Sequence, residues 1–71
     1  MNLEELSKQY RDSGTACRVR AEQLQRELRT ARLNEHSKHA LRVRIMHLED
    51  MATATLSTAN FLARYYDRTR S

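Results

Sequence analysis

Apolar and small residues recur at intervals of three and four along most of the chain, which is the spacing of one helical face. The second half is the more regular, because its members follow the strict four-three alternation of a heptad seam. The members of the two series are Leu3, Leu6, Tyr10, Gly14, Cys17, Ala21, Leu24, Leu28 and Ala31, then Leu41, Ile45, Leu48, Ala52, Thr55, Ala59, Leu62 and Tyr66. The pattern predicts two long helices.

Polar residues interrupt the periodicity at residues 32–39, and nothing apolar anchors the chain after Tyr66. A cluster of this kind between two periodic segments indicates a turn. We expect a single domain over residues 1–71, with a helix over about 3–33, a turn over about 34–37, a helix over about 38–67 and a frayed tail over 68–71.

Capping residues stand near the expected helix ends. Asn2 followed by Glu5 fits an N-cap with a reciprocating acid at the third helical position. Asn34 can adopt the left-handed conformation that ends a helix, and Ser37 can cap the next one. These residues predict that the first helix ends at the turn and the second begins after Ser37.

Two long helices joined by a short turn are expected to pack side by side and antiparallel, as an all-α helical hairpin. A turn near residue 35 places residue n opposite about residue 70 minus n. The small residues of 12–17 then face the small residues of 52–59. Leu24 and Leu28 face the larger aliphatic residues between Leu41 and Leu48.

Gly14 lies inside the first predicted helix, where glycine costs about 1 kcal/mol relative to alanine. Its position opposite a run of alanine and threonine predicts a point of close approach between the helices. A tolerated imperfection or a kink is the alternative interpretation.

The second helix carries more apolar residues than one seam requires. A wide exposed apolar face is an aggregation hazard unless a partner covers it. A second copy, giving a dimeric four-helix bundle, is the simplest cover, and another helical protein is the alternative. The residues expected to form this interaction surface are Met46, Met51, Leu56, Phe61 and Tyr65.

Thirteen Lys and Arg against nine Asp and Glu give the 71-residue chain a net charge of +4, spread evenly over both halves. Nucleic-acid binding by basic faces of a dimeric bundle is therefore an alternative function. Its candidate contacts are Arg18, Arg20, Arg42 and Arg44. Acidic residues interleave with these arginines, which is typical of a solvated helix surface.

The single cysteine, Cys17, favours a reducing compartment, and the first ten residues lack the features of a signal peptide. Apolar runs are far shorter than the ~20 residues that span a bilayer. We expect a cytoplasmic protein without membrane association.

Catalytic and metal-binding patterns are weak. His36 and His39 are three residues apart, but structural zinc sites recruit four ligands with cysteines prominent, and Cys17 is expected far from the turn. Cys17 has no histidine at its level, and the adjacent carboxylates diverge around the helix. We therefore expect no metal, no cofactor and no enzymatic activity.

The chain resembles two groups of helical hairpins. One comprises the aspartyl-phosphate phosphatases that act on sporulation response regulators, in which a serine of the second helix is followed four residues later by an aspartate. Here the residue four positions after Ser57 is Phe61, so the aspartate of that motif is missing. The other, a plasmid RNA-binding repressor, is similar in architecture and shares no motif. The sequence thus predicts a non-enzymatic adaptor or regulator that acts through self-association and helix-mediated protein contacts.

Overall fold

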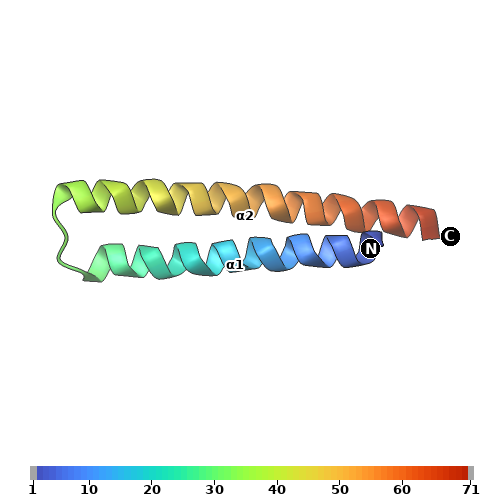
Figure 1. Ribbon diagram of the computed structural model, residues 1–71, viewed down its shortest axis with the longest axis horizontal. Helices are drawn as coiled ribbons and strands as arrows, with labels where there is room; N and C mark the ends of the chain where they lie inside the picture. Colours follow the sequence, from blue (N-terminus) through green and yellow to red (C-terminus); the bar gives the residue numbers. More distant parts are fainter. Residues whose placement is uncertain (1, 71) are drawn as a thin grey trace.

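The computed structural model describes the backbone of residues 2–70 and the side chains of residues 2–65. It is an all-α hairpin of two helices, α1 (Leu3–Thr30, 28 residues) and α2 (Glu35–Arg70, 36 residues). The helices run antiparallel along a rod of 56 × 16 × 14 Å, with the turn at one end and both termini at the other (Figure 1). The predicted hairpin is confirmed.

α1 begins at Leu3 as predicted, but its end and both ends of α2 differ from the predicted bounds. α1 ends at Thr30 instead of residue 33, and α2 begins at Glu35 instead of residue 38. The backbone of α2 continues to Arg70, three residues beyond the predicted end at about 67. Ser71 and the side chain of Tyr66, the last predicted seam position, lie outside the described residues.

Asn2 is the N-cap of α1, as the sequence predicts. The Oδ1 atom of Asn2 accepts a hydrogen bond from the backbone N–H of Glu5 at 2.8 Å. Glu4 and Glu5 also place negative charge in the first turn, where the helix dipole favours it. At the other end, the N–H of Ala31 donates to the carbonyl of Glu27 at 2.9 Å, and the backbone then becomes extended.

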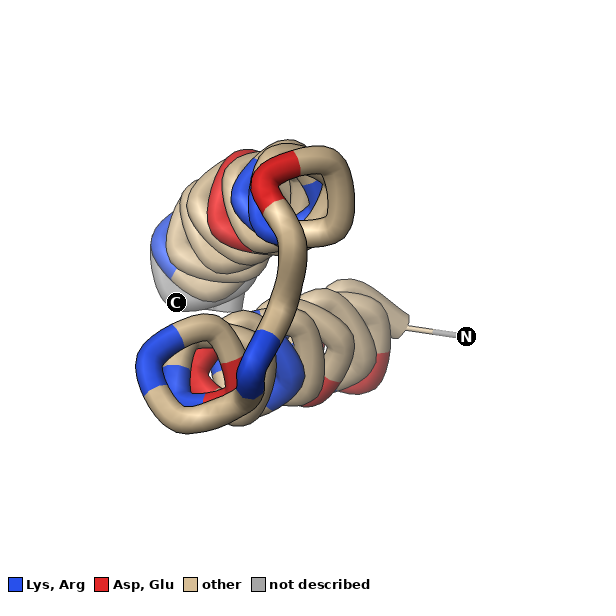
Figure 2. Tube along the Cα trace, turned by 90° about the vertical axis from the view of Figure 1, so that its left-hand side faces the viewer, with Lys and Arg blue, Asp and Glu red and all other residues tan. Residues whose placement is uncertain are grey.

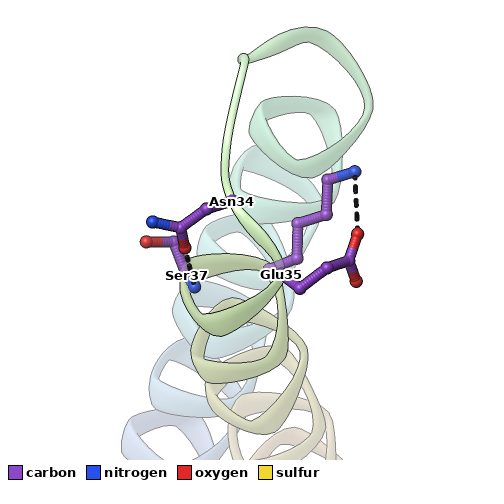
Figure 3. Close-up of polar contacts among 4 residues, drawn as sticks. Asn34, Glu35 and Ser37 are labelled. Atoms are coloured by element: carbon purple, nitrogen blue, oxygen red, sulfur yellow. Dashed lines mark hydrogen bonds and ion pairs between the residues drawn. The ribbon is translucent and has the colours of Figure 1, made fainter.

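The predicted roles of Asn34 and Ser37 are wrong. No non-glycine residue within 2–70 has a positive φ, so Asn34 does not end α1 in the left-handed conformation. Its Oδ1 instead accepts from the N–H of Ser37 at 2.8 Å, which makes Asn34 the N-cap of α2 (Figure 3). Asparagine caps at least as well as serine, and this choice adds a turn to α2. Glu35 also pairs with Lys38 at 3.6 Å in that turn.

Substitution of Asn34 distinguishes the two capping roles. Because its side chain accepts a helix N–H, Asn34→Ala is expected to lower the free energy of unfolding by about 1 kcal/mol, and Asn34→Asp to preserve it. Urea unfolding followed by circular dichroism measures both. A gain in stability from Asn34→Gly, with no loss from Asn34→Asp or Ala, would contradict the N-cap role, since that pattern belongs to a left-handed C-terminal position.

Small residues recur at every seventh position of the seam over residues 7–21 of α1 and 52–59 of α2. Among the described side chains, the buried residues of this kind are Ser7, Gly14 and Ala21 on α1 and Ala52 and Ala59 on α2. Leu24 and Ile45 are the larger buried residues, and half-buried leucines lie between them. Small residues at a fixed heptad position let the backbones of two helices approach closely.

Ser7 was not among the predicted seam residues, whereas Leu6 was. The structure buries Ser7, which is 5% exposed, and leaves Leu6 half-buried beside the seam. Burial of this hydroxyl is possible because its Oγ donates to the carbonyl of Ala59 on α2 at 2.8 Å. The hydrogen bond satisfies the polar group that a small seam position would otherwise leave unpaired.

The predicted register agrees with the contacts between the helices. Ser7 reaches Ala59, and an ideal Cβ built on Gly14 would meet Leu56 at 2.7 Å. Nearer the turn, the side chains of Gln25 and Glu49 are hydrogen-bonded. Each pair lies within about one helical turn of the expected alignment. Gly14 is therefore a point of close approach, as one of the two interpretations predicted.

Candidate interaction surface

The hairpin has one flank on which charged residues of both helices lie together. Gln25 of α1 donates to the carboxylate of Glu49 of α2 at 2.7 Å. The side of α1 that carries Gln25 therefore lies next to the side of α2 that carries Glu49. A groove of about 230 Å³ follows this contact. It is lined by Arg18, Ala21, Glu22, Gln25, Glu49, Ala52 and Thr53. We call this side of the seam the charged flank.

Over residues 2–16 and 51–65, the opposite side of the seam carries no charged residue. Helical spacing of 100° per residue brings its members to one side of each helix. We call it the uncharged flank, and define it as Leu6, Gln9, Tyr10, Ser13 and Ala16 of α1 with Met51, Ala54, Thr58, Phe61 and Tyr65 of α2. Leu6, Gln9, Tyr10 and Ser13 line one groove of about 210 Å³.

Large apolar side chains of the uncharged flank are strongly exposed. Phe61 is 67% exposed, Met51 55% and Tyr65 50%. The rings of Phe61 and Tyr65 stack with centroids 6.5 Å apart and planes inclined by 22°. The hydroxyl of Thr58 donates to the carbonyl of Ala54 at 3.0 Å, so its hydrogen is used within the helix. The flank is thus apolar in character with an aromatic pair near its end.

Charge returns to this side of α2 closer to the turn. A groove of about 530 Å³ continues from Met51 toward the turn. Its lining residues are Ala40, Val43, Arg44, His47, Leu48 and Met51. The uncharged flank therefore ends at Met51, where Arg44 and His47 begin to contribute.

The five residues predicted to form the interaction surface do not lie on one face. Met51, Phe61 and Tyr65 share the uncharged flank. Met46 is 53% exposed but lies about 140° around the helix from Met51, on the side of the charged flank. Leu56 is half-buried against Gly14 within the hairpin. The surface is divided because residues five apart diverge on a helix.

The α1 part of the uncharged flank was not identified as an exposed surface from the sequence. Leu6 and Tyr10 were placed on the seam, yet Tyr10 is 39% exposed and Leu6 lines a surface groove beside it. The repeat of small residues at 7, 14 and 21 is the signal that would have shifted the seam away from Leu6. Because the first member of that repeat is the polar residue Ser7, a search for apolar residues alone misses it.

The four candidate nucleic-acid arginines are not gathered into one patch. Arg18 lines the charged-flank groove, whereas Arg44 lines the groove on the other side of the hairpin. Arg20 donates to Gln23 on its own helix at 3.4 Å. Seen from the turn end, basic and acidic segments are interleaved along the helices (Figure 2). Arg18 and Arg44 therefore do not belong to one compact phosphate clamp within a single hairpin.

The histidines and the cysteine lie apart. His36 and His39 are in the first turns of α2, while Cys17 is half-buried in the middle of α1. Within the described part of the chain, no three His, Cys, Asp or Glu side chains come close enough to hold one metal ion. Neither helix, over the residues described, has an apolar stretch long enough to cross a bilayer.

Comparisons with known proteins add no relative. No protein-family description matches this chain, and neither the curated proteins nor the solved structures compared with it gave a match.

Proposed function

We propose that this chain is a non-enzymatic helical hairpin that self-associates in the cytoplasm and acts through helix-mediated protein contacts, as an adaptor or regulator. One observation supports the proposal most directly. Large apolar side chains of α2 are half or more exposed, whereas the buried hydrophobic core of the described residues contains three alanines and only two larger residues. Apolar surface of this extent favours association.

The thin core is a second reason to expect a partner. Among residues 2–65, Leu24 and Ile45 are the only large side chains in the buried core, and neither is completely enclosed. Domains of about 70 residues gain little stability from a single core and commonly rely on disulfides, metals or association. Cys17 is the sole cysteine, so an internal disulfide is excluded. Association with further helices would supply the missing burial.

Self-association is the simplest form of that partnership. Two identical hairpins can complete a four-helix bundle with two-fold symmetry. Sedimentation equilibrium at micromolar concentration is expected to give a mass twice the 8.4 kDa of the chain. A cooperatively folded species that remains monomeric over this range would contradict the homodimer and leave association with a different helical protein.

Nucleic-acid binding by Arg18, Arg20, Arg42 and Arg44 has weaker support, because these arginines are divided between two sides of the hairpin. If it occurs, affinity for generic RNA or duplex DNA must fall steeply as salt is raised.

A further inference from the structure

We infer that the uncharged flank is the face across which two copies of this chain pack, each terminal half against the other, with the two turns at opposite ends. The terminal half consists of residues 2–16 and 51–65, and the turn half of residues 17–50. Resting on the proposed self-association, this arrangement specifies the face, the partner and the orientation.

Charge distinguishes the uncharged flank from its opposite. The charged flank presents Arg18, Glu22 and Glu49 around one groove, and packing a copy there would remove these groups from water. The uncharged flank has no such group to desolvate, and its Thr58 hydroxyl already donates within α2. A face without charge can meet an identical face without like-charge repulsion.

The apolar area on the uncharged flank suits a dimer. Phe61, Met51, Tyr65 and Tyr10 are exposed by 67, 55, 50 and 39%. At ~200 Å² for each large side chain, they present about 400 Å² per copy. This is about half of the ~800 Å² that each partner buries in a standard interface. The small residues between them and Leu6 extend the same face toward that size.

The order of large and small residues favours an antiparallel arrangement of the two α2 helices. With Thr58 at the two-fold axis, Met51 of one copy lies opposite Tyr65 of the other, and Phe61 lies within one residue of the level of Ala54. Large side chains then meet small ones at one level, and a thioether meets an aromatic ring at the next. With aligned turns, packing the two flanks face to face would instead place α2 of one copy against α1 of the other and set Phe61 near the level of Tyr10, where two large side chains would meet.

The turn halves also favour opposite ends. Residues 17–50 contain eight Lys and Arg against five Asp and Glu, whereas residues 2–16 and 51–65 together contain three of each sign. Side-by-side hairpins with aligned turns would place two basic halves together. Turns at opposite ends separate them by more than a Debye length at physiological salt.

Matched substitutions at two exposed apolar residues test the face. Phe61→Asp on the uncharged flank is expected to raise the dimer dissociation constant at least ~100-fold, because each copy would bury an unpaired carboxylate. Met46→Asp, at a side chain that is 53% exposed on the other side of α2, is expected to leave the constant within about threefold. Analytical ultracentrifugation measures dissociation, and circular dichroism at high concentration verifies that each variant is helical.

Thr58→Arg is a second variant at the proposed axis, where two copies would bring like charges together. Arginine has a higher helix propensity than threonine, so unfolding of the variant is not the expected cause of dissociation. Dimers that survive both Phe61→Asp and Thr58→Arg, or that dissociate equally with Met46→Asp, would overturn the face while leaving self-association intact. A parent chain that is monomeric at every concentration would instead overturn the proposed function.

Spin labels test the orientation. In a Cys17→Ser background, His39→Cys places one label near the turn of each copy. With turns at opposite ends, the two labels are expected roughly 55–60 Å apart, from about 19 residues of helix on each side of the axis at ~1.5 Å per residue. Aligned turns would bring them within about two helix diameters, ~20 Å, and a distance in that range would overturn the orientation.

Discussion

Leu24→Ala is expected to lower the free energy of unfolding by about 2–5 kcal/mol, enough to unfold much of the protein at 25 °C. Leu24 is 3% exposed, and Ile45 is the only other large hydrophobic residue buried among the described side chains. Ala21, the buried seam residue one turn away on the same helix, is too small to move in and close the cavity. A core this thin provides only about 3–5 kcal/mol in a domain of this size.

Urea unfolding followed by helical circular dichroism measures the loss. Protein concentration must be held constant between variants, because association contributes to apparent stability. Val19→Ala is the matched control on the same helix, since Val19 is 48% exposed and alanine has the higher helix propensity. A cost below about 1 kcal/mol for Leu24→Ala would show that Leu24 is not part of the stabilising core.

The sequence predicts the hairpin well because two signals agree. The heptad periodicity of both segments specifies helices with one apolar side, and a short interruption leaves antiparallel packing as the available arrangement. The register then follows from the position of the turn. This is why the sequence alone places Gly14 opposite residues 52–59, where the structure has it against Leu56 and Ala52.

The helix ends near the turn were harder to predict, since several residues there have capping ability. Asn34 can end one helix or begin another, and Ser37 can begin one. Which residue acts as the cap depends on the path of the chain through residues 31–34, and that path is a property of the packed hairpin. The observed cap follows from Asn34 accepting the N–H of Ser37.

The exposed surface was predicted only in part for a similar reason. Met51, Phe61 and Tyr65 stand out by size, and helical spacing alone already sets Met46 about 140° from Met51. The pattern of α2 alone does not show which residues of α1 extend each side, and this becomes visible once α1 contributes Gln25 against Glu49 on one flank and Tyr10 on the other. A surface shared by two helices depends on their alignment as well as on each periodicity.

Gly14→Ala is expected to destabilise the hairpin by about 1 kcal/mol, against the sign that helix propensity alone would give. In an isolated helix this substitution stabilises by about 1 kcal/mol. Here an added Cβ would lie 2.7 Å from Cγ of Leu56, 2.9 Å from its Cδ2 and 3.3 Å from the carbonyl oxygen of Ala52. Overpacking of this kind costs about 1–3 kcal/mol. Chemical unfolding of the variant measures the net effect.

The partner residue Leu56 allows the two opposing terms to be separated. In a Leu56→Ala background the side chain that meets the new Cβ is gone, and only the contact with the Ala52 carbonyl remains. Gly14→Ala is therefore expected to be neutral or stabilising in that background, and a double-mutant cycle should give a coupling of about 1–2 kcal/mol. Thr15→Ala, at an exposed neighbouring position outside the uncharged flank, reports a gain in helix propensity without the contact. Close packing of Gly14 against Leu56 must make the effect of Gly14→Ala differ between the two backgrounds. If Gly14→Ala stabilises the parent chain and the Leu56→Ala chain by the same amount, the glycine is a tolerated imperfection of α1.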